Sequence, residues 1–109
     1  NNNVELLWLF PKSKSQYRLK GEAYEIKENI RFWKNLSEHS KASWFWPNPG
    51  GKLSQRSSYD TPKTLERPET FTVLEVKINY VELLKLERPI HKRYCWNKNK
   101  SWKRIELNP

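Results

Sequence analysis

Apolar and polar positions along both ends of the chain follow the pattern of β-strands. In the segment from Phe71, the side chains of Leu74, Val76 and Ile78 would share one face, because strand residues two apart point to the same side. Pro11 ends the first apolar run, and turns are expected near Asn79 and across residues 97–100. The predicted strands are Val4–Phe10, Gln16–Ile26, Phe71–Ile78, Tyr80–Leu86, His91–Trp96 and Trp102–Leu107.

The middle of the chain has a different pattern. Ile30, Trp33 and Leu36 recur at helical spacing, which predicts a short helix from about Glu28. Ser37 is a suitable cap for a second short helix over residues 38–45, and the Pro- and Gly-rich residues 47–51 would end it. Residues 52–68 are almost free of apolar side chains, so we expect a mobile loop there.

These elements predict a mainly β fold for residues 1–109, taken as a single domain. We expect an antiparallel half-barrel of about six strands, with one or two helices between about Glu28 and Trp46. The first two strands and the last two would each form a hairpin. Gly21 would mark a bulge or a close approach of two backbones.

The composition indicates a folded chain with a strong positive charge. The 109 residues include six tryptophans, and the formal net charge is +9. Such a charge favours an anionic partner, although it also serves solubility. Cys95 is the only cysteine, which favours a reducing compartment and hence the cytoplasm. No apolar run is long enough to span a bilayer, so no membrane partner is expected.

Two same-face pairs are the best candidates for chemistry. His91 and Arg93 would project together from one strand, and Gln16 and Arg18 from another. Arginine binds anions through paired N–H donors, and histidine can move a proton near neutral pH. The alternative is that both pairs are ordinary solvent-exposed strand positions.

The order of motifs resembles the pyridoxamine 5'-phosphate oxidase family of flavin-binding split barrels. The motifs are Gln16 to Gly21, Trp33 to Ser37, Pro47 to Gly50, Val81–Glu82, and the run His91–Lys92–Arg93 followed by Trp96 and the terminal Leu107–Asn108–Pro109. The resemblance covers nearly the whole chain, from Val4 to Pro109, and it matches the C-terminal half of such a protein.

The resemblance implies a cofactor, an activity and a set of site residues. The cofactor would be FMN, bound between the two subunits of a homodimer, in an oxidoreductase acting on an anionic small molecule. Arg93 and His91 would be catalytic, and His91 and Ser40 would bind the substrate. The implied flavin-binding residues are Gln16, Arg18, Pro49, Gly50 and Arg93.

The sequence also departs from the family. Pro89 replaces an arginine that contacts the substrate phosphate, and Leu84 replaces a flavin-contacting tryptophan. The family's main flavin-phosphate motif, Arg-x-x-x-Leu-Lys, has no match, so we expect this chain alone to bind FMN weakly or not at all. A different class of function, a basic β-barrel module for single-stranded nucleic acid or another polyanion, is the alternative that the net charge leaves open.

Overall fold

The computed structural model describes residues 1–109, which form two compact units. The first, here called the sheet unit, comprises Asn1–Tyr24 and Glu75–Pro109, and the second, the helical unit, comprises Glu25–Leu74. That the two units belong to one domain, as the sequence predicts, stays a prediction.

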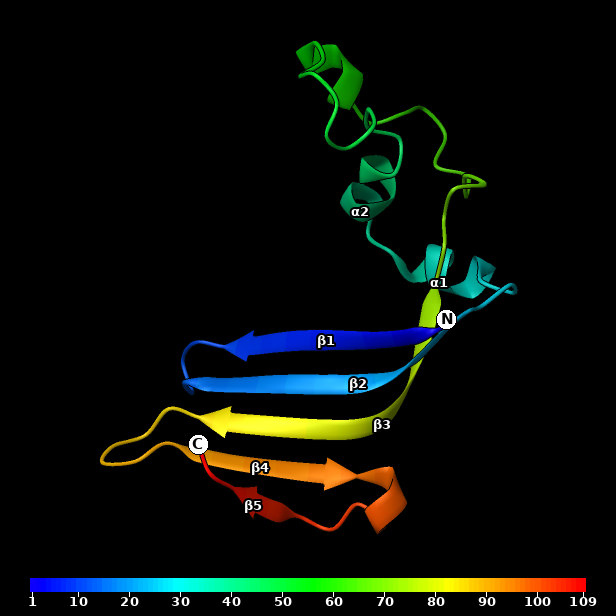
Figure 1. The fold of residues 1–109 in the computed structure, drawn as a ribbon. Coiled ribbons are helices and arrows are strands. Elements are labelled where there is room, and N and C mark those ends of the chain that lie inside the picture. Colours follow the sequence, from blue (N-terminus) through cyan, green and yellow to red (C-terminus); the bar gives the residue numbers. More distant parts are fainter. The chain divides into compact units, whose positions relative to one another are not determined.

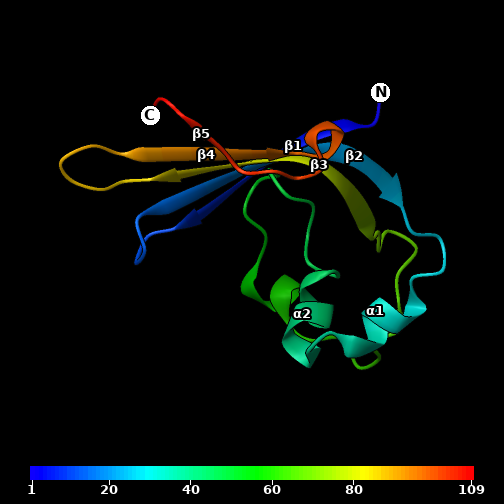
Figure 2. The same cartoon turned by 90° about the horizontal axis from the view of Figure 1, so that it is seen from below.

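Five strands form one open sheet in the order of the sequence. They are β1 (Asn3–Phe10), β2 (Ser15–Glu25), β3 (Leu74–Lys85), β4 (Lys92–Asn97) and β5 (Ile105–Leu107). Neighbouring strands run antiparallel and lie in a single layer (Figure 1). The predicted mainly β, antiparallel half-barrel is confirmed. Figure 2 shows that β2 and β3 are curved, as expected of strands that form part of a barrel wall.

The prediction of a turn near Asn79 is wrong. Residues 71–78 and 80–86 do not form a hairpin, because Leu74–Lys85 is one continuous strand, and the sheet has five strands rather than six. The two-residue alternation runs straight through Asn79, so Ile78 and Tyr80 share a face. Asn79 has no glycine or proline beside it, and a lone asparagine does not break such a pattern.

Both predicted hairpins are present. In the first, Leu6 lies opposite Leu19, and the turn between the strands is closed by a hydrogen bond from the Lys14 amide to the Pro11 carbonyl. In the second, β4 pairs with β5 across the short 3-10 helix η2 (Lys98–Lys100). The last strand is shorter than predicted because Ser101 and Trp102 have positive φ angles of 55° and 58°, which no strand accommodates.

Gly21 marks a close approach between β2 and β3, as its position in a strand predicted. A methyl group at Gly21 would overlap the carbonyl oxygen of Lys77 and lie 3.1 Å from the Cα of Ile78. Only a residue without a side chain fits between these two backbones.

The helical unit contains α1 (Ile30–Asn35) and α2 (Glu38–Ser43). Both predicted helices are confirmed, although α2 ends before Phe45. The Ser37 hydroxyl accepts a hydrogen bond from the Ser40 amide at 3.1 Å, so Ser37 is the predicted cap. No helix is long and apolar enough to cross a membrane.

An aromatic core organises the helical unit. Trp33 is 3% exposed and packs edge-to-face against Phe71, whose ring also contacts Trp44. The Trp33 indole N–H donates to the Leu65 carbonyl at 3.0 Å, which attaches the predicted loop, residues 52–68, to this core. That loop has one regular element, the 3-10 helix η1 (Arg56–Tyr59); its mobility stays a prediction.

Candidate functional site

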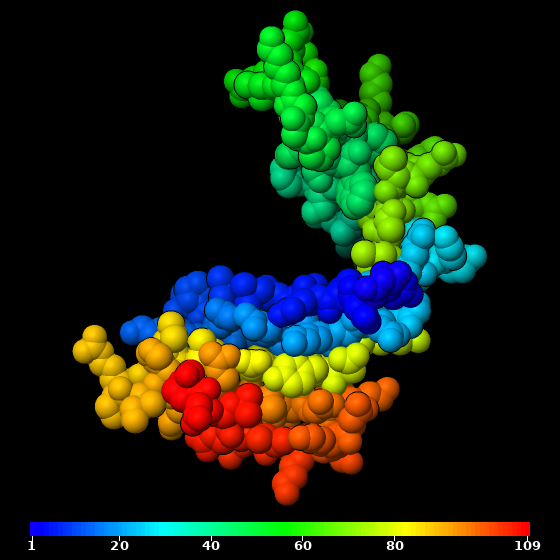
Figure 3. Space-filling model, in the orientation of Figure 1, coloured from blue at the N-terminus to red at the C-terminus, as the bar shows by residue number.

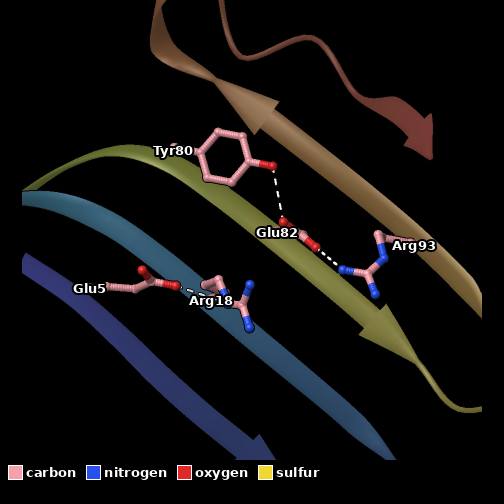
Figure 4. Close-up of polar contacts among 5 residues, drawn as sticks. All are labelled: Glu5, Arg18, Tyr80, Glu82 and Arg93. Atoms are coloured by element: carbon pink, nitrogen blue, oxygen red, sulfur yellow. Dashed lines mark hydrogen bonds and ion pairs between the residues drawn. The ribbon is translucent and has the colours of Figure 1, made fainter. Parts of the chain in front are cut away.

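A charged cluster lies on one face of the sheet and draws its side chains from four strands, β1 to β4. Arg93 on β4 lies opposite Leu84, two residues from Glu82 on β3, so Arg93 and Glu82 are diagonal neighbours on one face. Lys20 on β2 lies over the ring of Tyr80 at 5.2 Å, which places Lys20, and with it Arg18, on the same face. Figure 4 shows Glu5, Arg18, Tyr80, Glu82 and Arg93, which we call the sheet cluster.

Glu82 is the centre of the sheet cluster. Its carboxylate accepts hydrogen bonds from the Arg93 guanidinium and, at 3.1 Å, from the Tyr80 hydroxyl. The Glu82 side chain is only 12% exposed and that of Arg93 29% exposed. Burial alone would raise the pKa of Glu82, but the hydrogen bonds from Arg93 and Tyr80, with the charges of Arg93 and Arg18, hold it below its ordinary value. Glu82 is therefore a carboxylate at neutral pH.

Tyr80 is a fixed hydrogen-bond donor in the sheet cluster. Burial, together with the hydrogen bond to Glu82 and the charge of that carboxylate, raises the pKa of Tyr80 to about 12. Its phenol therefore keeps its proton across the physiological range. Cys95, buried on β4 opposite Glu82, contributes to the same shift.

The second ion pair of the sheet cluster joins β1 and β2. Arg18 Nε lies 2.9 Å from the Glu5 carboxylate, and both side chains are about half exposed. Arg18 and Arg93 are thus each paired with a glutamate, and the four charges cancel. A guanidinium has five N–H donors, so Arg93 can hold Glu82 and still donate to the oxygen of a ligand. The sheet cluster offers directed donors rather than surplus positive charge.

Gln16 lies on the same face of β2 as Arg18, two residues away. It borders a small apolar hollow of 220 Å³ whose other walls include Leu9, Leu84 and Leu86. An amide at the rim of an apolar hollow can orient one polar edge of a ring while the apolar walls cover the rest.

No hydrogen bond joins His91 to Arg93. It precedes β4 and is exposed, and its Nδ1 accepts a hydrogen bond from the Glu87 amide at 3.2 Å. Because Nδ1 accepts in this arrangement, Nε2 carries the hydrogen of the neutral imidazole ring. That His91 acts together with Arg93 stays a prediction.

The other predicted site residues belong to the helical unit. Ser40 is in the first turn of α2, where its hydroxyl lies 2.9 Å from that of Ser37. Pro49 and Gly50 form a tight turn closed by a hydrogen bond from the Gly51 amide to the Asn48 carbonyl, with Gly50 at a φ of 77°. Pro followed by Gly suits this geometry, because the second residue must adopt a positive φ.

Sequence reasoning missed Glu5, Tyr80 and Glu82 as members of the site. Glu82 carries a signal that could have revealed it, since it is the one charged residue in the apolar run Val81–Leu84. A charge within a half-buried strand needs a partner. Glu5 carries the same signal, as the one charged residue in the run Val4–Phe10, but its pairing with Arg18 depends on the register of β1 with β2.

Comparison with known proteins supports the fold. No protein-family model and no curated protein matches the sequence. A solved structure of a pyridoxamine 5'-phosphate oxidase-related, FMN-binding protein from Nostoc punctiforme matches all of this chain with a TM-score of 0.81 and 22% sequence identity. This chain has its fold. PhzG from Burkholderia lata, solved with tetrahydrophenazine-1-carboxylic acid, also matches 100% of the chain, with a TM-score of 0.78 and 18% identity.

The resemblance to pyridoxamine 5'-phosphate oxidase-like proteins is therefore confirmed at the level of fold. The chain spans 64% of the length of the Nostoc protein and 60% of that of PhzG.

Proposed function

We propose that this chain forms part of an FMN site and that the full-length gene product is an FMN-dependent oxidoreductase. The supporting observation is the agreement in fold, over 100% of the chain, with a protein that binds FMN. Gln16 and, within the sheet cluster, Arg93 add chemical support, because they present N–H donors from one face of the sheet.

These residues suit the flavin ring better than the flavin phosphate. The ring is apolar at one end and carries carbonyl oxygens at the other, and the small hollow beside Gln16 has apolar walls with an amide at the rim. The two arginines of the sheet cluster are neutralised by Glu5 and Glu82. A doubly charged phosphate needs unpaired cations, so we place it outside the sheet cluster.

FMN would supply the redox chemistry by accepting a hydride from the substrate. The protein residues would orient the reactants. Arg93, fixed by Glu82, would donate to an electron-rich oxygen of the ring or the substrate, and the Nε2–H of His91 would donate a hydrogen bond. We further propose an anionic small-molecule substrate, a homodimer with the flavin at its interface, and a cytoplasmic location.

An FMN titration of the full-length gene product tests this proposal, with flavin fluorescence as the readout. Arg93→Ala should weaken FMN binding about ten- to a hundredfold, because a hydrogen bond to a charged group contributes roughly 1.5–3 kcal/mol. Arg93→Lys should restore only part of the affinity, since an ammonium cannot make paired planar contacts. Gln16→Ala, which breaks no ion pair, should weaken binding by about fivefold, consistent with the loss of one neutral hydrogen bond.

Lys92→Ala is the matched control. Lys92 neighbours Arg93 but points to the opposite face and pairs with Glu87. If Lys92→Ala weakens FMN binding as much as Arg93→Ala, the effect is one of overall charge, and the polyanion-binding alternative gains. Absence of FMN binding by the unmodified full-length protein would reject the proposal.

A further inference from the structure

A basic turn closes the last hairpin of the sheet unit. Residues 97–104, which join β4 to β5 through the 3-10 helix η2, include Lys98, Lys100, Lys103 and Arg104 and no acidic residue. All four residues are exposed, and none forms an ion pair. We call residues 97–104 the basic turn; it follows β4 in Figure 1, in dark orange. Unlike the arginines of the sheet cluster, its cations are free to bind an anion.

The backbone of the basic turn is held by its own hydrogen bonds. The Asn99 amide donates to the Asn97 side chain at 2.9 Å, and the Trp102 amide donates to the Asn97 carbonyl at 3.0 Å. The Ser101 amide donates to the Lys98 carbonyl at 3.1 Å. Cations on a fixed turn bind a partner with less loss of conformational freedom than the same cations on a flexible segment.

Aromatic rings accompany the cations. Trp102 belongs to the basic turn and is 42% exposed, so part of its indole is available for stacking. The Arg104 guanidinium lies 5.0 Å from the centroid of the Tyr94 ring, an arrangement that orients the guanidinium and leaves the N–H donors at its edge available. Tyr94 is adjacent to Arg93 on β4, so this stacked pair lies on the opposite face of the sheet from the sheet cluster.

Charge and aromatic surface together select the class of partner. Single-stranded nucleic acids bind proteins through cations that follow the phosphates and through aromatic rings that stack on unpaired bases. An anionic membrane surface would also attract the cations, but interfacial binding increases with the apolar area that is buried. Trp102 is the only apolar side chain of the basic turn, whose uncharged residues are otherwise Asn97, Asn99 and Ser101. This composition favours a single-stranded nucleic acid over a membrane.

We propose that the basic turn binds single-stranded nucleic acid without base specificity: its four cations pair with phosphates, and Trp102 stacks on a base. The proposal goes beyond the flavin function and holds whether or not the sheet cluster binds FMN. Each phosphate contact on a single strand contributes about −0.7 to the slope of log K against log salt concentration, so four contacts predict a slope of about −2.8. The affinity should then fall roughly fiftyfold between about 50 and 200 mM salt.

The test uses the full-length gene product and a fluorescein-labelled oligothymidylate of about 12 nucleotides, with fluorescence anisotropy as the readout. A labelled duplex of the same length is the first comparison, because its paired bases cannot stack on Trp102. Vesicles of phosphatidylserine and phosphatidylcholine, assayed by co-sedimentation, are the second. We expect the single strand to bind best and with the predicted salt dependence. Failure of the single strand to bind, equal or tighter binding of the duplex, or binding to the vesicles alone would overturn the proposal.

Two sets of substitutions locate the binding. Lys98→Gln combined with Lys100→Gln should weaken binding of the single strand about tenfold at low salt and reduce the slope to about −1.4, since two phosphate contacts are lost. Trp102→Asn suits the left-handed backbone at this position, where φ is 58°. It should weaken binding about tenfold without changing the slope, because stacking involves no phosphate charge.

Matched controls lie elsewhere in the chain. Lys12→Gln combined with Lys14→Gln removes the same charge from the β1–β2 turn, where both lysines are exposed and unpaired. Trp46→Ala removes a ring of the helical unit that is likewise 42% exposed. Neither control should change the affinity or the slope as its counterpart in the basic turn does, and equal effects would reject the proposal. Excess FMN should leave binding of the single strand unchanged, and its displacement by FMN would reject the proposal as well.

Discussion

At the scale of single residues, Glu82 shows how an ion-pair partner changes the role of a side chain. Arg93 could be identified from the sequence as a candidate anion-binding group. In the structure its guanidinium is bonded to Glu82, so its first role is to neutralise a nearly buried carboxylate. A charge left unpaired at this depth would lower the free energy of unfolding, so the two side chains stay paired. This pairing also fixes the direction of the guanidinium.

Glu82→Gln should make the protein less stable near neutral pH. The carboxylate receives hydrogen bonds from Arg93 and Tyr80, and glutamine keeps the shape but not the charge, so the loss should be roughly 1 kcal/mol. Because the folded-state pKa of Glu82 lies below the ordinary value of 4.5, its stabilising effect is complete above that pH and is lost as the pH falls through the lowered pKa.

Thermal unfolding measured at about pH 7 and about pH 3 tests this, since the wild type and Glu82→Gln should differ at the first pH and converge toward the second. Glu75→Gln, on the same strand but exposed and without an ion pair, is the control and should unfold like the wild type throughout. A difference between wild type and Glu82→Gln that is the same at both pH values would contradict the expectation.

At the scale of elements, the contact between β2 and β3 joins parts of the chain that are far apart in sequence. Gly21 permits this contact by letting β2 approach the backbone of Lys77 and Ile78. The two central strands carry Arg18 and Glu82, so their spacing decides whether the sheet cluster can form. At the edge of the sheet, β1 exposes Leu7 and Trp8 (59% and 61% exposed). Figure 3 shows this N-terminal part of the chain in dark blue.

Gly21→Ala should destabilise the sheet unit by about 1–3 kcal/mol, as expected when a methyl group is forced into a packed site. The added carbon would meet the backbone of Lys77, which cannot move aside like a flexible side chain. Chemical denaturation is the measurement. Gly51→Ala, where the nearest atom outside the neighbouring residues is the Asn48 oxygen at 3.2 Å, should cost clearly less. Equal losses would mean that the β2–β3 contact is looser than the structure indicates.

At the scale of the whole molecule, net charge and local charge differ. The chain has a formal charge of +9, yet the arginines of the sheet cluster are paired with acids. Most of the excess positive charge is carried by other residues, largely exposed lysines. Net charge by itself thus describes solubility and long-range attraction, not the location of a binding site.

The 109-residue chain, titrated by itself with FMN, should bind weakly or not at all. The cancelled charges of the sheet cluster leave no unpaired arginine there for the phosphate, and the sequence has no match to the family's phosphate motif. Flavin fluorescence is the readout, with riboflavin as the control because it lacks the phosphate. Sub-micromolar FMN binding, much tighter than that of riboflavin, would show that a phosphate site exists within these residues.

The sequence by itself determined the elements whose signals are local. The apolar run from Val4, ended by Pro11, and the proline-free apolar segment from Gln16 defined the first hairpin, and Ser37 marked the start of α2, because such runs and caps depend only on neighbouring residues. The mistaken turn at Asn79 also came from a local signal. Asparagine favours turns, but the two-residue alternation of the strand continues through this position.

Tertiary structure alone decided which distant groups meet. The pairing of Arg93 with Glu82, of Arg18 with Glu5, and of Gly21 with the backbone of Lys77 depends on strand order and register. Trp46 and Tyr59 become walls of one pocket only after the intervening loop has folded back. A register shift of one residue would turn each of these strand side chains to the other face. Local periodicity is the same in either register, so it cannot predict which distant residues align.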